Sequence, residues 1–186
     1  MNASANISAI ILAGGEGRRA GGRDKGLIDY QGKPLIEHVI EHIRPQCDDI
    51  IISANRNLDS YGRYTDKVIS DEADSYRGPL AGIAACLPHC AHALALVVAC
   101  DMPQLPAPLA DRLLAHMTDA DVAIACVDGH HQLALLLKTS LQKSIDDRLA
   151  GNRLKLIDWV RAQKHASISF DDIPQAFANL NSLPAD

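Results

Sequence analysis

Short apolar runs alternate with helix-forming segments along this chain, and no other sequence feature constrains the fold as strongly. Ile7–Leu12 and Ala93–Ala99 are apolar runs of the kind found in strands buried on both faces of a sheet. Between them, Leu35, Val39 and Ile43 recur at helical spacing. Strands that alternate with helices predict an α/β fold with a mostly parallel sheet between layers of helices.

The remaining elements follow from the same patterns. Further strands are expected at Leu27–Tyr30, Asp49–Ser53, Lys67–Ser70, Asp121–Val127, Gln132–Leu137 and His165–Ser169. Further helices are expected from Pro34 and at Pro79–Leu87, Pro108–Met117, Thr139–Leu149 and Arg153–Arg161. The 186 residues contain no linker or repeat, so residues 1–186 are expected to form a single three-layer domain.

Composition argues against several classes of function. A net charge of −5 weighs against a nucleic-acid groove, and the longest apolar run is too short to cross a membrane. The segment Met1–Ala9 has no Lys or Arg, so it is a poor signal peptide. An odd cysteine count indicates reduced thiols and a cytoplasmic location. Cys86 and Cys90 are spaced too loosely for a zinc site and are better explained as small buried thiols near a helix end.

The expected fold also predicts where a ligand binds. In sheets of this kind, ligands bind beyond the carboxyl ends of the parallel strands. That rule brings together loops that are widely separated in sequence. These loops are Ala13–Lys25, Ala54–Asn57, Asp71–Gly78 and Cys100–Leu105.

The most informative of these loops is glycine-rich. It contains five glycines and directly follows the first apolar run, and Arg18, Arg19, Arg23 and Lys25 lie among or beside them. Glycines let backbone N–H groups approach phosphate oxygens, and the basic side chains supply matching charge. The alternative is a flexible surface loop, but the position after a buried strand favours phosphate binding.

Two familiar phosphate loops do not fit the context. Gly15, Gly17 and Ala20 match the dinucleotide fingerprint, but Gly21-Gly22 follows where that fingerprint requires a helix. A Walker loop would end in Gly-Lys-Ser or Gly-Lys-Thr, whereas Gly32-Lys33 is followed by proline.

A third kind of loop does fit. Leu12-Ala13-Gly14-Gly15, followed by Arg19, Gly21-Gly22 and Lys25, resembles the signature loop of nucleotidyltransferases. Within that group it is most similar to the molybdenum cofactor guanylyltransferases of the MobA type. This resemblance implies a Rossmann-like nucleotidyltransferase fold and an enzyme that transfers GMP from GTP to molybdopterin with release of pyrophosphate.

Later motifs extend the resemblance from Ile10 to Asn181. They are Ser53-Ala54-Asn55-Arg56, Asp71, Gly78-Pro79-Leu80-Ala81-Gly82, Cys100-Asp101-Met102-Pro103, Gly151-Asn152-Arg153 with Trp159, and Asn179-Leu180-Asn181-Ser182. The resemblance implies a nucleotide-binding part over about residues 7–105 and an acceptor-binding part over about residues 106–186. It also implies that molybdopterin insertion and delivery proteins act as partners, with no nucleic acid and no membrane.

The resemblance assigns roles to individual residues. Arg19, Lys25 and Asp101 are the expected catalytic residues. The expected nucleotide contacts are Leu12, Ala13, Gly14, Gly15, Lys25, Asn55, Asp71, Gly78 and Asp101. The expected acceptor contacts are Gly82, Asn179 and Asn181, although Asn179 and Asn181 serve equally well as caps of the chain's tail.

Chemistry supports the roles of three of these residues. A carboxylate at a strand end, as at Asp101, suits Mg²⁺, which takes one or two carboxylates plus phosphate oxygens; the alternative is a helix cap. Lys25 would stabilise the leaving pyrophosphate, unless it is only a solvated loop lysine. Asp71 could accept paired hydrogen bonds from guanine, although an aspartate in a turn is also common.

Some features leave the acceptor and the base open. Ser182 stands where the family usually has Thr, and His131-Gln132-Leu133 differs from its usual His-Pro or Gln-Pro. A cytidylyltransferase acting on the same cofactor, a sugar-phosphate nucleotidyltransferase and a nucleotide-binding adaptor are therefore the alternatives. His130 and His131 are better explained as surface histidines of a hairpin than as catalytic groups.

Overall fold

The protein is built on one large sheet, seen in a computed structural model that describes residues 6–14, 24–71 and 77–179. The strands are β1 (Ile7–Leu12), β2 (Asp29–Tyr30), β3 (Lys33–Pro34), β4 (Asp49–Ser53), β5 (Val68–Ile69), β6 (Leu94–Ala99), β7 (Val122–Val127), β8 (His130–Lys138) and β9 (His165–Ser169). Seven of them form a sheet in the order β5-β4-β1-β6-β8-β7-β9, and β2 pairs with β3 separately.

The sheet is mostly parallel, as the sequence predicts. β1 pairs in parallel with β4 and β6, β4 pairs in parallel with β5, and β7 pairs in parallel with β9. Only β8 runs the other way among the seven strands of this sheet, antiparallel to both β6 and β7. The carboxyl ends of β1, β4, β5 and β6 therefore meet at one edge, where the predicted site lies.

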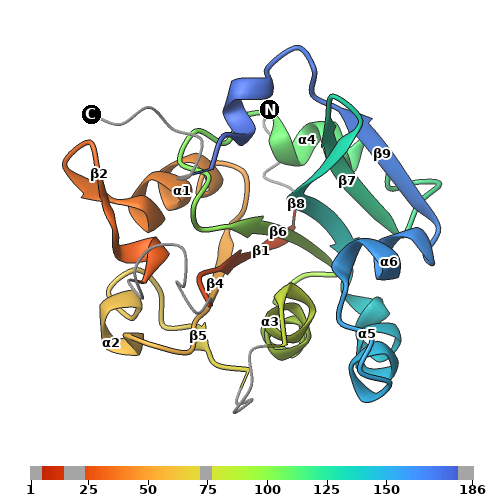
Figure 1. The fold of residues 1–186 in the computed structure, drawn as a ribbon, viewed down its shortest axis with the longest axis horizontal. Coiled ribbons are helices and arrows are strands. Elements are labelled where there is room, and N and C mark those ends of the chain that lie inside the picture. The colour runs from red at the N-terminus through yellow and green to blue at the C-terminus, as the bar shows by residue number, and fades with distance from the viewer. Residues whose placement is uncertain (1–5, 15–23, 72–76, 180–186) are drawn as a thin grey trace.

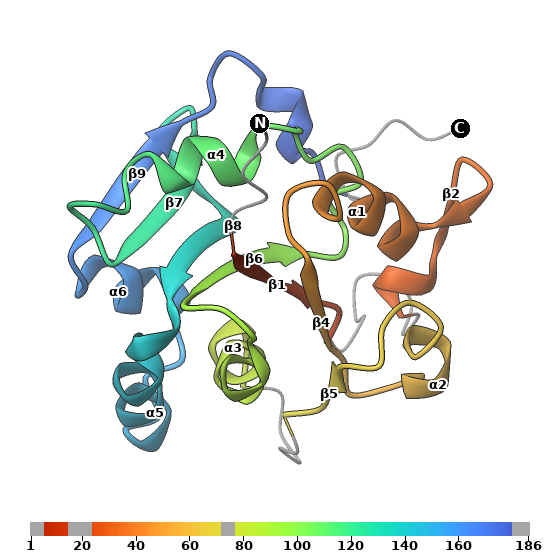
Figure 2. The same ribbon diagram turned by 180° about the vertical axis from the view of Figure 1, so that it is seen from behind.

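Helices cover both faces of this sheet. They are α1 (Leu35–Ile43), α2 (Leu58–Tyr61), α3 (Pro79–Cys86), α4 (Leu109–Leu114), α5 (Gln142–Ala150) and α6 (Leu156–Arg161), with 3₁₀ turns η2 (Lys25–Leu27), η3 (Leu87–His89), η4 (Thr139–Leu141) and η5 (Pro174–Phe177). Helices α1 and α4 lie on one face, and α3 and α5 lie on the other (Figures 1 and 2). The arrangement is the predicted three-layer one.

Two apolar clusters form the core, one on each face. Because strand side chains alternate between faces, Ile7, Ala9 and Ile11 of β1 pack with α1 and α4, whereas Ile10 and Leu12 pack with α3. Each fully buried aliphatic side chain of this kind contributes about 1.5–3 kcal/mol. The carboxyl ends of the strands thus rest on a rigid base.

Several boundaries differ from those expected. Helix α4 is shorter at both ends than Pro108–Met117, and α6 begins at Leu156 instead of Arg153. Pro34 ends β3 and caps α1, so the helix starts one residue later than predicted. The expected strand at Leu27–Tyr30 is a 3₁₀ turn followed by the two-residue β2.

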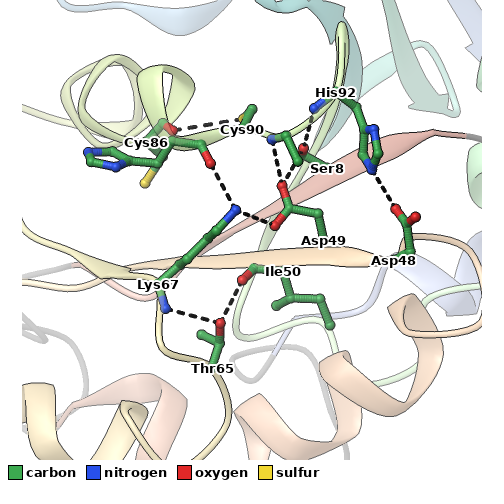
Figure 3. A network of polar contacts seen from close by, with 11 residues as sticks. Ser8, Asp48, Asp49, Ile50, Thr65, Lys67, Cys86, Cys90 and His92 are labelled. Atoms are coloured by element: carbon green, nitrogen blue, oxygen red, sulfur yellow. Dashed lines mark hydrogen bonds and ion pairs between the residues drawn. The ribbon is translucent and has the colours of Figure 1, made fainter.

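Polar side chains link the amino ends of the parallel strands β1, β4, β5 and β6 (Figure 3). Asp49, at the start of β4, accepts hydrogen bonds from Ser8 Oγ of β1 at 2.6 Å and from Lys67 Nζ, next to β5, at 2.7 Å. It also accepts one from the Ala91 N–H at 2.8 Å, and the His92 N–H donates to Ser8 Oγ at 3.2 Å. One carboxylate therefore links the starts of all four strands.

Candidate active site

Backbone hydrogen bonds carry the strand pairing past the carboxyl ends of the strands and fix the first loop residues. The N–H of Ala13 donates to the carbonyl of Ser53 at 2.8 Å, and the N–H of Cys100 donates to the carbonyl of Leu12 at 3.1 Å. The N–H of Ala54 donates to the carbonyl of Ile69 at 2.9 Å. These bonds hold the starts of three loops, at Ala13, Ala54 and Cys100, side by side at one edge of the sheet.

An ion pair joins two of the predicted catalytic residues across this edge. Lys25 Nζ lies 3.0 Å from Asp101 Oδ2, although the residues are 76 positions apart in sequence. Their side chains are 29% and 15% exposed, so both are reachable from solvent while being largely enclosed by protein. The predicted proximity of the phosphate loop and the strand-end carboxylate is confirmed for these two residues.

A second polar group lies at the ends of β4 and β5. Asn55 donates from Nδ2 to Asp71 Oδ1 at 2.6 Å. Its Oδ1 accepts from Ser70 Oγ at 2.9 Å and from the Asp71 N–H at 3.1 Å. Because both ends of the Asn55 amide are engaged, Asn55 orients the Asp71 carboxylate.

Glycines in the predicted site have different reasons to be there. A Cβ on Gly82 would lie 2.6 Å from Ser53 Oγ and 3.1 Å from Leu12 Cδ2, so the close approach of α3 to the sheet requires glycine. Gly78 has φ +74° and is the N-cap of α3, which begins at Pro79. At Gly14, by contrast, a Cβ would be 3.7 Å or more from the described atoms around it, which is ordinary contact. The packing of the described residues therefore explains Gly82 but not Gly14.

Some predicted residues cannot be placed in this way. Gly15 and Arg19, with the neighbouring Arg18 and Arg23, lie outside the described residues, and so does Asn181. Asn179 is exposed and follows η5. The assigned roles of these residues stay predictions, as does the acceptor role of the buried Gly82.

The two histidines lie in the hairpin that the sequence predicts, and they differ in exposure. Asp128 and Gly129, both with positive φ, connect β7 to β8. His130 is exposed, whereas His131 is half-buried, with Nε2 2.7 Å from Ser167 Oγ. Burial lowers the pKa of His131, and the nearby charges of Arg161 and His165 lower it further.

Sequence reasoning missed the polar group around Asp24, the residue that precedes Lys25. Asp24 Oδ1 accepts a hydrogen bond from the Tyr61 hydroxyl, and Asp24 Oδ2 accepts one from Asn57 Nδ2 at 3.0 Å. Asn57 is the N-cap of α2 and Tyr61 is its last residue, and α2 is an element that the sequence did not predict. The only local signal was an Asn before a short run ending in a buried aromatic residue.

The donors at this site suit a divalent cation that is bound together with a polyphosphate. Asp101 Oδ2 already contacts a cationic group, the ammonium of Lys25. Among residues 6–14, 24–71 and 77–179, no three His, Cys, Asp or Glu side chains gather into a metal site. A cation at Asp101 would therefore take its other ligands from phosphate and water, which is how Mg²⁺ is usually held.

The fold and this edge together define an α/β nucleotidyltransferase. Residues 9–166 match the family model described as the MobA-like NTP transferase domain. Relatives named molybdenum cofactor guanylyltransferase are 43% identical over 181 residues in Shewanella putrefaciens and 44% identical over 183 residues in Shewanella amazonensis. Each alignment covers 96% of this chain and 93% of the relative. The chain therefore belongs to the molybdenum cofactor guanylyltransferase family.

Solved structures agree on the fold. A structure of molybdopterin-guanine dinucleotide biosynthesis protein A from Archaeoglobus fulgidus superposes with a TM-score of 0.76 at 23% identity. It covers 94% of this chain, and this chain covers 92% of it. The bifunctional IspDF of Campylobacter jejuni gives a TM-score of 0.75 at 17% identity, over 95% of this chain and 52% of that one. The predicted nucleotidyltransferase fold is confirmed.

In the parts of the chain that the structure describes, no helix has both the length and the apolar content needed to span a bilayer.

Proposed function

We propose that this protein transfers GMP from GTP to molybdopterin, releasing pyrophosphate and forming the molybdopterin guanine dinucleotide cofactor. The observation that carries the proposal is the 3.0 Å pair between Lys25 and Asp101 at the carboxyl ends of the strands. It supports the two groups acting on one polyphosphate. The names of the relatives favour this reaction over a cytidylyltransferase or a sugar-phosphate enzyme.

Residues near the exit of β1 are proposed to bind the phosphates of GTP. The backbone of Ala13 and Gly14 lies at the exit of β1 and is proposed to contact the phosphates there. Lys25 binds the phosphates and stabilises the charge that develops on the leaving pyrophosphate. Arg19 is proposed as a second cation on the same phosphates.

Asp101 is proposed as the protein ligand of Mg²⁺. Its carboxylate follows directly after β6 and Cys100 and is only 15% exposed, so protein surrounds it on most sides. The chemistry that magnesium supplies when bound is neutralisation of negative charge on the triphosphate. Lys25 is then proposed to move from Asp101 to the phosphates, because the metal would repel the ammonium group while the triphosphate would attract it.

The reaction needs no nucleophile from the protein. An oxygen of the molybdopterin phosphate attacks the α-phosphorus of GTP and forms the new P–O bond. The bond between the α-phosphorus and its bridging oxygen breaks, and that oxygen leaves with pyrophosphate. The described residues position and neutralise the reactants, which is the main form of catalysis in phosphoryl-type transfers.

Asp71 is proposed to select guanine. Its carboxylate, oriented by Asn55 at 2.6 Å, can accept from the N1–H and amino group of guanine. Adenine lacks that donor pair, so the Asp71 carboxylate would keep only its bond from Asn55 and lose the two from the base. Gly78 is proposed to line the nucleotide site. Asn179 and Asn181, in the acceptor-binding part of about residues 106–186, are proposed to contact the acceptor together with Gly82 from the nucleotide-binding part of about residues 7–105.

The test is pyrophosphate release. A mixture of the protein, GTP, Mg²⁺ and molybdopterin should yield pyrophosphate together with the guanine dinucleotide product. Competition among the four ribonucleoside triphosphates should be won by GTP. Preferential use of CTP would reassign the base, and GTP binding without any turnover would reduce the protein to an adaptor. A cytoplasmic location and transfer of the product to insertion and delivery proteins belong to the same proposal.

A further inference from the structure

We propose that Tyr61 and Asn57 are positioning residues that hold Lys25 at the reaction site through Asp24. This inference deepens the proposed function, because it rests on the phosphate-binding role of Lys25. It adds α2 to the machinery of the site, although α2 lies in a different part of the sequence from the glycine-rich loop. Helix α2 and the 3₁₀ turn η2, which begins just after Asp24, lie side by side in both views of the fold (Figures 1 and 2).

The argument begins with the Asp24 carboxylate. Tyr61 donates its hydroxyl hydrogen to Oδ1, and Asn57 donates from Nδ2 to Oδ2 at 3.0 Å. Both oxygens are thereby engaged by neutral donors from one short helix and its N-cap. Hydrogen bonds to a carboxylate are stronger than those between neutral groups, so Asp24 is held firmly against α2.

The anchor on the other side is the core. The Tyr61 ring is fully buried in the apolar cluster that includes α1 and the first strand. Burial raises the pKa of Tyr61, and the hydrogen bond to Asp24 raises it further, so the hydroxyl stays protonated and keeps donating. Asp24 is in this way tied to the apolar core through Tyr61.

The two chain neighbours of Lys25, Asp24 and Gly26, both contact Tyr61. Asp24 precedes Lys25, and Gly26 follows it with its backbone against the Tyr61 ring, where a Cβ would lie 2.5 Å from the hydroxyl oxygen. The 3₁₀ turn closes over Lys25, with the Leu27 N–H donating to the Asp24 carbonyl at 3.1 Å. The backbone of Lys25 is therefore fixed on both sides.

Fixing the backbone matters because a lysine side chain is long and rotatable. Its ammonium group is a point charge on a flexible stem, so its precision depends on where the stem begins. Misplacing a catalytic group by about 1 Å can cost on the order of 10²-fold in rate. The contact chain from Tyr61 to Asp24 to Lys25 ends at Asp101, 3.0 Å away.

A double-mutant cycle tests the proposal. Tyr61→Phe removes only the hydroxyl, and Asn57→Gly removes the amide from a residue whose φ of +52° glycine tolerates. Each should lower kcat/KM for GTP and the affinity for Mg²⁺-GTP by about tenfold. In a Lys25→Met background each should change these quantities by less than about twofold, because the group being positioned is gone.

The matched control is Tyr64→Phe. Tyr64 lies three positions from Tyr61 and donates to Glu37 Oε1 at 3.2 Å instead of to Asp24. It should leave GTP affinity and turnover unchanged in both backgrounds. Thermal unfolding of each variant shows that it is folded at the assay temperature.

The outcomes separate this proposal from the one on which it rests. Equal losses with and without Lys25, or no loss in Tyr61→Phe and Asn57→Gly, would overturn the positioning role. The binding cycle decides that point even if the wild-type protein binds GTP and releases no pyrophosphate, a result that would refute only the proposed reaction. A wild-type protein that binds no triphosphate would overturn both.

Discussion

The four parallel strands β1, β4, β5 and β6 carry one polar cluster at their amino ends and another at their carboxyl ends. The two clusters are built differently. At the amino ends, Asp49 is 10% exposed and takes its partners from the starts of the neighbouring strands, including the fully buried Ser8. At the carboxyl ends, Lys25 and Asp101 extend from loops and meet across the edge of the sheet.

The difference shows how one sheet separates stability from chemistry. Groups at the amino ends are satisfied by fixed backbone and side-chain partners close to the strands, so their interactions stabilise the fold. Lys25 at the carboxyl end is held by its contact with Asp101, which a metal-bound polyphosphate replaces in the proposed reaction. Substitutions at the two ends should therefore affect different measurements.

The largest effect is expected from Asp101→Asn. It keeps the shape of the side chain and removes the charge that binds the metal, so kcat should fall by about 10³-fold. The melting temperature should change little, because the carboxylate lies at the open edge. Pyrophosphate release and thermal unfolding measure the two quantities.

Asp111→Asn, on the exposed side of α4, controls for the lost charge and should keep full activity. Asp101→Asn with near-normal turnover would contradict the metal assignment.

The opposite pattern is expected from Asp49→Ala. It leaves the buried Ser8 hydroxyl and the Ala91 N–H without their acceptor, which should cost about 2 kcal/mol of unfolding free energy. The melting temperature should drop by about 6 °C, with kcat of the folded protein unchanged. Denaturant unfolding provides the free energy.

Asp48→Ala is the neighbouring control. Asp48 is 55% exposed and pairs with His92, so its loss should leave stability nearly unchanged. Equal destabilisation by the two variants would mean that the amino-end network is not what distinguishes Asp49.

Lys25→Met should change metal binding in an unusual direction. In the protein without nucleotide, the Lys25 ammonium competes for Asp101 Oδ2, so its removal should raise the affinity for free Mn²⁺ by about tenfold. The affinity for GTP should fall in the same variant. Electron paramagnetic resonance of Mn²⁺ measures the first effect, and weaker Mn²⁺ binding in Lys25→Met would show that the pair does not block the metal.

The smallest effect concerns acid stability. Burial raises the pKa of Asp49, but the hydrogen bonds from Lys67, Ser8 and Ala91 outweigh it and hold the pKa below its usual value. A carboxyl group with a lowered pKa stabilises the fold above its unfolded pKa of about 3.9, and this contribution is lost as the pH falls through the folded value.

Unfolding free energy should therefore drop less in Asp49→Asn than in the wild type between pH 6 and pH 3. Plotted against pH, the unfolding free energies of Asp49→Asn and the wild type should converge toward pH 3. Parallel curves would show that other groups set the acid dependence.

Sequence patterns correctly predicted the buried strands and the edge of the sheet at which the candidate site lies. β1 and β6 are apolar runs whose burial is decided by composition, and parallel order then brings Lys25 and Asp101 to one edge. Boundaries were less accurate where helices are short, as at α4 and α6, because few turns fix their ends.

Contacts between distant segments left no such pattern. Tyr61 and Asp24 are 37 positions apart, and Ser8 and Asp49 are 41 apart. Neither pair has a spacing that a helix or strand period would reveal. Helix α2 was missed for a related reason, since Leu58–Tyr61 is too short to show helical periodicity.

A crystal structure of the protein with Mg²⁺ and a non-hydrolysable GTP analogue tests the central claim most directly. The account predicts the triphosphate at the exit of β1, with Lys25 moved from Asp101 to phosphate oxygens and Asp101 on the metal. A triphosphate bound away from the carboxyl ends of the strands, or one that leaves the Lys25–Asp101 pair intact, would contradict it.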